Sequence, residues 1–263
     1  KHLTAPLPAP HISGKTAVIT GGTRGIGEMI ATGFVDMGVK TYVTSRKADA
    51  CAAIQEKLGC EAAPFDLSQN EGVDAFGDWI AEREDKIDIL INNAGALWAE
   101  PLETYTEEGW DRTIDLNVKS IFFLTQKLLP QLRAAAQDKG TARVINIGSV
   151  EGLTTPVWEN YAYPISKAAV HQMTKVLANK LAKDQITVNA IAPGPFESKM
   201  TAFVLGNEQG KSAVGSAMPL GRIGQPEDII GLSAFLSSPA ANYITGTVIP
   251  LDGGFVIGAK SWD

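Results

Sequence analysis

Short apolar runs alternate with longer segments whose apolar residues recur at helical spacing, from residue 15 almost to the end of the chain. The short β-branched runs predict seven strands, over 16–20, 39–45, 60–65, 87–92, 142–148, 186–192 and 247–252. The longer segments predict helices over 25–37, 48–58, 70–83, 107–132, 163–183 and 226–237. Gly38 and Gly59 follow two of these helices, where glycine commonly forms the C-terminal cap.

Regular alternation of strand and helix predicts an α/β fold, a doubly wound parallel sheet of about seven strands with helices on both faces. The nearly continuous apolar strands agree with this, because such a sheet is buried on both sides. We expect one domain over 12–263, preceded by a flexible extension over 1–11. The least regular stretch, 193–225, indicates a functional lid at about 195–220.

Composition narrows the class of protein. The chain is 44% hydrophobic and 20% charged with a formal net charge of −6, and it has no basic stripe, which argues against a nucleic-acid partner. No apolar run is long enough to predict a membrane span. Two cysteines cannot form a disulfide framework, so we expect idle thiols, a reducing compartment and a cytoplasmic location. No metal site is expected.

The first predicted strand leads directly into the glycine-rich sequence TGGTRGIG at 20–27. Gly21 and Gly25 permit turn conformations that other residues avoid, and Gly27 lets the following helix approach the sheet. Free N–H groups at the helix start, together with the helix dipole, favour a diphosphate. A strand, glycine turn and helix in this order predict dinucleotide binding of the Rossmann type, although the spacing differs from the usual GxGxxG.

The second predicted strand ends in TYVTSRK and carries no carboxylate at its tip. An acidic residue there would bind the ribose of NAD. Ser45 and Arg46 occupy the position instead, and Arg24 lies inside the glycine turn. Two guanidinium groups suit a 2′-phosphate, so the sequence predicts NADP(H) as the cofactor.

Tyr163 and Lys167 are four residues apart and therefore neighbours on a helix. A nearby ammonium favours the phenolate and lowers the pKa of a tyrosine, so the pair can act as general acid and base. Ser149 ends the fifth predicted strand, where ligands bind in sheets of this kind. Pro164 places Tyr163 in the first helical turn, with Asn160 as a candidate N-cap. Tyr161 lacks a lysine partner.

These motifs, with Asn117 in IDLNV, resemble the short-chain dehydrogenase/reductase family over about residues 14–254. The resemblance implies a catalytic tetrad of Asn117, Ser149, Tyr163 and Lys167. In it, Tyr163 gives a proton to the carbonyl oxygen and Ser149 polarises that oxygen. Lys167 holds the nicotinamide ribose and tunes Tyr163, and Asn117 holds a water linked to Lys167. Within the family, the sequence is most similar to the 3-oxoacyl reductases, including the rhamnolipid-pathway type.

The resemblance also implies the cofactor contacts, with Ser198 in place of the family's usual threonine. The expected cofactor-binding residues are Gly21, Thr23, Arg24, Gly25, Ile26, Gly27, Ser45, Arg46, Asp66, Leu67, Asn93, Ala94, Gly95, Tyr163, Lys167, Pro193, Gly194, Phe196 and Ser198.

Substrate contacts are expected from the lid and from the loops after the fourth and fifth strands. Their bulky apolar residues are Leu97, Trp98, Val157, Trp158, Phe196, Met200, Phe203 and Val204. They predict a hydrophobic ketone or acyl substrate that is reduced to a secondary alcohol. An oxidative alcohol or sugar dehydrogenase remains an alternative, as does a non-catalytic dinucleotide-binding sensor. Apolar residues on more than one face of 163–183 favour packing against a partner helix. The resemblance implies a homo-oligomer, a dimer or tetramer, formed through this helix and 107–132.

Overall fold

The computed structural model describes residues 11–156, 158–198 and 201–258. Its centre is one sheet of seven parallel strands in the order β3-β2-β1-β4-β5-β6-β7. The strands are β1 (Thr16–Thr20), β2 (Lys40–Ser45), β3 (Glu61–Pro64), β4 (Ile89–Asn92), β5 (Ala142–Ile147), β6 (Ile186–Pro193) and β7 (Val248–Leu251). The predicted α/β doubly wound fold is confirmed.

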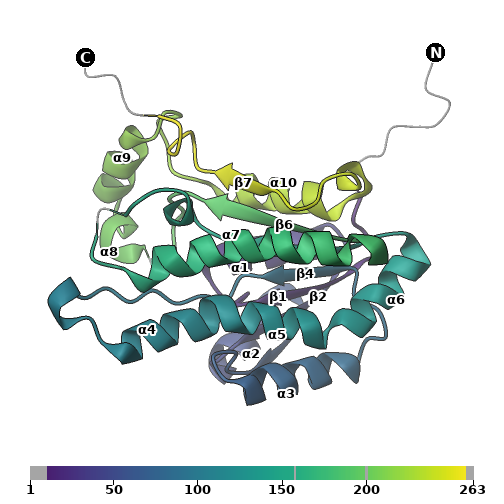
Figure 1. The fold of residues 1–263 in the computed structure, drawn as a ribbon. Helices are drawn as coiled ribbons and strands as arrows, with labels where there is room; N and C mark the ends of the chain where they lie inside the picture. Colours follow the sequence, from purple (N-terminus) through teal and green to yellow (C-terminus); the bar gives the residue numbers. More distant parts are fainter. Residues whose placement is uncertain (1–10, 157, 199–200, 259–263) are drawn as a thin grey trace, which may run out of the picture.

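Helices cover both faces of the sheet (Figure 1). They are α1 (Gly25–Asp36), α2 (Ala48–Leu58), α3 (Asn70–Ala81), α4 (Glu107–Ile114), α5 (Ser120–Lys127), α6 (Leu129–Lys139), α7 (Ala162–Leu181), α8 (Ala202–Leu205), α9 (Glu208–Ala217) and α10 (Pro226–Ser237). Short 3₁₀ turns are η1 (Leu102–Thr104), η3 (Val150–Gly152), η4 (Ala182–Asp184) and η5 (Pro239–Ala241), and η2 (Asp115–Lys119) is a π-helix.

Two hydrophobic cores lie on opposite faces of the sheet. Ala17 and Ile19 of β1 pack with α1, α2 and α10, whereas Val18 packs with α3, α5, α6 and α7. Successive strand residues point to opposite faces, and both faces of β1 are buried, which explains its unbroken apolar sequence. Because helices cover both faces of the sheet, a ligand is expected at the strand ends.

The prediction of one long helix over 107–132 is wrong. The chain forms α4, the π-helix η2 and α5, and α6 then begins after a break at Leu128. Pro130 lies in the first turn of α6, where its missing N–H costs little but would interrupt a continuous helix. A π turn inside a helix often marks a functional site, and this one contains Asn117.

The segment predicted as an irregular lid contains two helices, α8 and α9, which lie beyond one end of the sheet (Figure 1). The Asn207 side chain accepts a hydrogen bond from the Gly210 N–H and caps α9. A bridge between Phe196 and Gly224 joins the two ends of this segment. The predicted lid therefore contains regular helices, and its two ends lie next to each other beside β6.

The other chain-wide expectations concern the extension, thiols, membrane and metals. Residues 1–10 of the predicted N-terminal extension lie outside the described residues, whereas Ile12 is already buried in the core. Cys51 and Cys60 are free and buried. Among the helices described, none combines the length and hydropathy needed to cross a bilayer. The described residues also contain no group of three or more His, Cys, Asp or Glu side chains that could hold a metal ion.

Candidate active site

The carboxyl ends of β1 and β4 form the switch point of the sheet. From β1 the chain builds outward to β2 and β3, and from β4 it builds in the other direction. Ligands of doubly wound sheets bind in the crevice at such a point. The glycine turn follows β1 and the Asn93–Gly95 loop follows β4, so the structure brings these predicted cofactor residues together.

The two loops touch so closely that one of them requires glycine. A Cβ on Gly21 would lie 2.9 Å from the Cα of Ala94, and Gly21 has a φ of +65°. Thr20 Oγ1 accepts hydrogen bonds from the backbone N–H groups of Asn93 and Ala94, each 3.0 Å long. The Asn93 side chain donates to the carbonyls of Thr20 and Gly21. Sequence reasoning missed Thr20, whose signal is a buried hydroxyl on the last residue of an apolar strand.

The start of α1 is held against the same loop. A Cβ on Gly27 would lie 2.4 Å from both Asn93 Nδ2 and the Gly21 carbonyl oxygen. Ser198 of the lid faces the turn from the other side, because a Cβ on Gly25 would lie 3.1 Å from the Ser198 Cβ. The first N–H groups of a helix have no partner within the helix and attract an anion. This cradle fits a diphosphate.

The predicted 2′-phosphate residues follow two neighbouring strands: Arg24 lies in the turn after β1, and Ser45 and Arg46 lie at the end of β2. Arg24 and Arg46 are exposed, and the structure records no ion pair for either within its described residues. Ser45 Oγ accepts a hydrogen bond from the Lys47 N–H. Two guanidinium groups uncommitted to carboxylates suit a phosphate ester.

Asp66 and Leu67, two predicted cofactor-binding residues that follow β3, are less open to a ligand. Leu67 is buried in the hydrophobic core, so its side chain is unavailable. Asp66 Oδ1 accepts hydrogen bonds from the backbone and the hydroxyl of Ser68. A role for this pair in binding the cofactor therefore stays a prediction.

Ser149, Tyr163 and Lys167 meet at the carboxyl end of β5. The Ser149 hydroxyl lies close enough to the Tyr163 phenol to lower its pKa through a side-chain interaction. The Lys167 Nζ donates to the Ile147 carbonyl at 2.8 Å and lies 5.5 Å from the centre of the Tyr163 ring. A Cβ on Gly95 would be 3.7 Å from the same Nζ, so the lysine borders the loop after β4. These three residues therefore lie together near the loops that follow β4 and β5.

Burial governs the titration of this pair. It raises the pKa of Tyr163 to about 12, with the charge of Glu151 acting in the same direction and the Ser149 side chain opposing it. Burial also lowers the pKa of Lys167 to about 8. Lys167 is not among the groups that shift the pKa of Tyr163 in this structure, so its role in tuning Tyr163 stays a prediction. The raised pKa keeps the Tyr163 phenol neutral here.

Asn117 connects the β4 loop to α7 from within the π-helix. Its Oδ1 accepts from the Ala96 N–H at 2.8 Å, and its Nδ2 donates to the Ala96 carbonyl and to Ser166 Oγ, both at 2.9 Å. The side chain is thus fully engaged in holding backbone next to Lys167. The water expected at Asn117 stays a prediction.

The start of α7 differs from prediction in its cap. Pro164 lies in the first turn, as predicted, but the residue preceding the helix is Tyr161 and no side chain caps it. Asn160 instead donates from Nδ2 to Glu151 Oε2 at 2.7 Å. The Tyr161 hydroxyl lies 3.5 Å from a Glu159 oxygen, whereas Tyr163 lies next to Ser149. The prediction of Asn160 as cap is wrong, because Tyr161 precedes the helix and Asn160 Oδ1, the atom that would accept, has no hydrogen-bond partner among the described residues.

A buried polar chain beneath the site was missed by sequence reasoning. Asn92 Nδ2 donates to Asn146 Oδ1, and Asn146 Nδ2 donates to Thr174 Oγ1, each at 2.9 Å. Asn92 and Asn146 are paired in register on β4 and β5, and Thr174 lies on α7. The signal for this chain was asparagine at the same position near the end of two apolar strands. It fixes α7 relative to the strands that carry the site.

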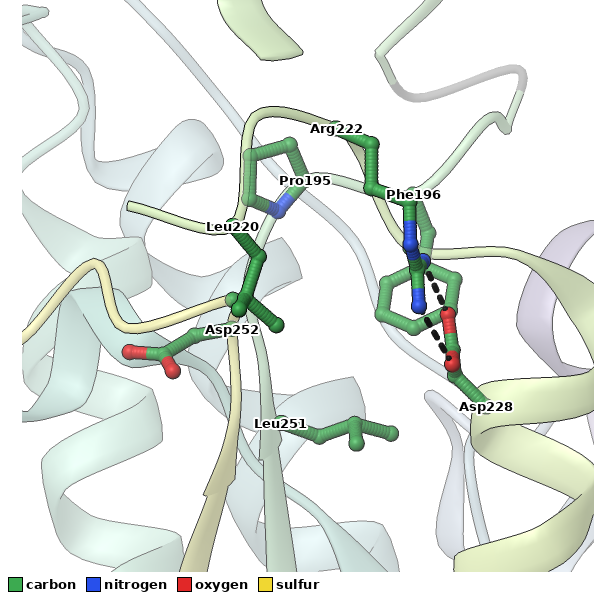
Figure 2. Close-up of a pocket in the computed structure, with 9 residues that line it drawn as sticks. Pro195, Phe196, Leu220, Arg222, Asp228, Leu251 and Asp252 are labelled. Atoms are coloured by element: carbon green, nitrogen blue, oxygen red, sulfur yellow. Dashed lines mark hydrogen bonds and ion pairs between the residues drawn. The ribbon is translucent and has the colours of Figure 1, made fainter. Parts of the chain in front are cut away.

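The lid base is packed and its predicted contact Phe196 is buried. The Phe196 ring belongs to the hydrophobic core, and a Cβ on Gly224 would lie 2.3 Å from it. The prediction of Phe196 as a substrate contact is therefore wrong for its side chain. Next to it lies a cavity of about 70 Å³, beside the Arg222–Asp228 ion pair (Figure 2). This cavity has room for a few waters, not for a nicotinamide ring.

The structure describes part of the chain on either side of Phe196. Pro193 ends β6 and Gly194 follows it, and a Cβ on Gly194 would lie 2.8 Å from the Cα of Asp252. Ser198 Oγ and Thr201 Oγ1 share a hydrogen bond of 3.0 Å. Val157 and Met200 lie outside the described residues, as do the side chains of Phe203 and Val204.

The loop tryptophans have structural neighbours. The Trp98 indole packs on α4, because a Cβ on Gly109 would lie 2.3 Å from it, and the Arg112 guanidinium lies 5.3 Å from the ring centre. Trp158 is 45% exposed, and its Nε1 donates to Glu151 at 3.3 Å. Trp158 is thus the more accessible of the two for a substrate.

A diphosphate cradle beside a half-buried phenol and a buried ammonium is typical of dinucleotide-dependent oxidoreductases. A family model described as Enoyl-(Acyl carrier protein) reductase matches residues 21–256. The chain belongs to the short-chain dehydrogenase/reductase family, as its motifs predicted.

Individual relatives agree with this assignment. The rhamnolipids biosynthesis 3-oxoacyl-(acyl-carrier-protein) reductase of Pseudomonas aeruginosa is 43% identical over 248 residues, 93% of this chain and 97% of that protein. The Pseudomonas aeruginosa RhlG/NADP active-site complex has a TM-score of 0.91 and 42% identity, covering 96% of this chain and all of that one. Gluconate 5-dehydrogenase of Gluconobacter oxydans is 33% identical, covering 94% of this chain and 96% of that protein.

Proposed function

We propose that the protein uses NADPH to reduce the ketone of a hydrophobic, acyl-type substrate to a secondary alcohol. The observation that carries this proposal is the placement of Ser149, the neutral Tyr163 and Lys167 next to one another, at the sheet edge that carries the glycine turn. A relative at 42% identity is described as an NADP complex, which supports the choice of cofactor.

The glycine turn and the two free arginines are the residues that would hold the cofactor. The start of α1 would bind the diphosphate, and Arg24 and Arg46 would bind the 2′-phosphate. When bound, NADPH supplies the hydride that reaches the carbonyl carbon. Gly95 and Lys167 border the place where the ribose next to the nicotinamide would lie.

The chain's own residues supply the proton and its control. Tyr163 donates its phenolic proton to the carbonyl oxygen, and Ser149 donates a hydrogen bond that polarises this oxygen. With a pKa near 12 Tyr163 is protonated throughout the neutral range. Lys167, with a pKa of about 8, is mainly charged at neutral pH and can also exchange a proton there.

Glu151 favours a neutral substrate over an acidic one. Its carboxylate lies close enough to raise the pKa of Tyr163, and it holds Trp158 and Asn160 through its two oxygens. A second carboxylate brought to this side of the site would be repelled at short range and low dielectric. This disfavours the rival activity, oxidation of a sugar acid, which the printed name of the Gluconobacter relative suggests.

The test is NADPH consumption with matched ketones. We expect turnover of neutral 3-oxo esters, rising with acyl chain length, and little turnover of 5-ketogluconate. Glu151→Gln should improve reduction of an anionic ketone such as acetoacetate relative to its ethyl ester. Preference for 5-ketogluconate, or an unchanged ratio in the variant, would contradict the substrate assignment.

We also propose a homo-oligomer formed through α5 and α7. Phe122 and Phe123 on α5 are 40% and 38% exposed, and Ile165 and Val176 on α7 are 50% and 58% exposed. Side chains of this kind favour burial against a second copy. Light scattering after size exclusion should give a dimer or tetramer, and Val176→Glu should lower its mass to that of a monomer.

A further inference from the structure

His171 lies one helical turn beyond Lys167 on α7, so Tyr163, Lys167 and His171 follow one another at spacings of four residues. The side chain is 5% exposed and is absent from the mechanism above. Its ring lies under the turn that carries Ser149. The question is what a buried histidine does at this position.

The ring fills the space left by two glycines that bracket Ser149. A Cβ on Gly148 would lie 2.2 Å from His171 Nε2, and a Cβ on Gly152 would lie 2.7 Å from its Cε1. Neither contact leaves room for a side chain. The imidazole therefore packs directly against the backbone that leads from β5 into η3.

The same ring binds the backbone of the catalytic serine. The Ser149 N–H donates to His171 Nε2 over 3.5 Å, at the long end for a hydrogen bond. The Gly152 N–H donates to the Ser149 carbonyl, and the Glu151 N–H donates to Ser149 Oγ. His171 thus supplies the contact from below that holds the serine backbone while its Oγ faces Tyr163.

This contact requires one protonation state. Nε2 must accept, so a neutral ring carries its proton on Nδ1. Burial, with the positive charges of Lys167 and Lys175 on the same helix, lowers the pKa of His171 to about 4, whereas the Gly152 backbone acts in the opposite direction. A second cation directly beside Lys167 is thereby avoided at neutral pH.

We infer that His171 is a positioning residue that fixes Ser149 through its neutral Nδ1–H tautomer. The inference rests on the proposed function, in which Ser149 polarises the substrate oxygen. His171 lies on α7 with Tyr163 and Lys167, but it acts through Ser149 rather than on the substrate.

The kinetic test compares two replacements of similar size. His171→Phe keeps a ring without an acceptor, and His171→Gln places an amide oxygen near Nε2. We expect His171→Phe to lower kcat about 10- to 100-fold, since small misplacements of reacting groups have effects of this size, with the Kd for NADPH unchanged. His171→Gln should restore most of kcat. A kcat within two-fold of wild type for His171→Phe, or equal losses in both variants, would overturn the inference.

A measurement on the unaltered protein covers the case in which His171→Phe does not fold. The chain has three histidines, so the ¹⁵N signals lost in His171→Gln identify His171. We expect a neutral Nδ1–H tautomer from pH 5 to 8, and an Nε2–H tautomer or a charged ring would refute the assignment. This readout is independent of turnover: absence of ketone reduction would remove the proposed function while the tautomer still reported the contact with Ser149.

Discussion

Gly27 is the residue whose replacement tests the glycine turn most sharply. Gly27→Ala adds one methyl group that would meet Asn93 Nδ2 and the Gly21 carbonyl at 2.4 Å. Neither neighbour can retreat freely, because Asn93 is bonded to two carbonyls and Gly21 is held by its N–H to Thr44. The start of α1 must therefore move away from the Asn93 loop.

The size of the effect follows from what this movement breaks. Overpacking by one methyl group costs about 1–3 kcal/mol, and the two Asn93 hydrogen bonds contribute about 1 kcal/mol each. We expect the free energy of unfolding to fall by roughly 2–4 kcal/mol when these overlapping effects are combined. Loss of one hydrogen bond to a charged diphosphate would raise the Kd for NADPH about 10- to 100-fold.

Gly231→Ala is the matched control. Gly231 also lies within a helix, α10, and an added Cβ there meets nothing within 4 Å. Alanine should stabilise this helix by about 0.5–1 kcal/mol and leave the Kd for NADPH unchanged. Urea unfolding and fluorescence titration with NADPH measure both quantities. If Gly27→Ala bound NADPH as tightly as Gly231→Ala does, the assignment of the turn to the diphosphate would be refuted.

Three further predictions concern charge and pH. Arg46→Asp should raise the KM for NADPH about 10- to 100-fold and change that for NADH little, so equal effects would remove the 2′-phosphate argument. The value of kcat/KM for reduction should fall above about pH 8, where Lys167 loses its proton while Tyr163 keeps its own, and a profile flat to pH 10 would contradict this. As the pH falls below 6.5, His171 takes up a proton in the unfolded chain but stays neutral in the folded protein down to about pH 4. The free energy of unfolding therefore decreases by about 3 kcal/mol between pH 6.5 and pH 4. Urea unfolding should show this loss to be smaller in His171→Gln.

The sheet could be predicted from sequence because each strand is a short apolar run between polar or glycine-containing boundaries. Strand β1 was predicted at the bounds it has, and β4 begins two residues later than predicted. Ile87 and Asp88 are buried ahead of it, and the Asp88 backbone already hydrogen-bonds to Thr16 of β1 and Arg143 of β5. The helix break at Leu128 was missed because periodicity continues through it. Apolar spacing records which face is buried and carries little information about a local change of helix type.

The site was predictable where a residue type follows from chemistry at a strand end. Ser149 was found in this way and Tyr163 and Lys167 from their helical spacing, and the structure brings the three together. Thr20 and His171 were missed because their partners are backbone groups far away in sequence, at Asn93 and Ser149. No spacing rule predicts a contact that depends on how two elements pack.

The central claim is that Tyr163 is the proton donor to a ketone reduced beside it. Single-turnover reduction of a neutral 3-oxo ester by preloaded enzyme, followed by loss of NADPH absorbance, tests it most directly. Tyr163→Phe should lower the rate at least about 100-fold, the scale of general acid catalysis, with NADPH affinity unchanged. A variant that reduces the ester at the wild-type rate would contradict the claim.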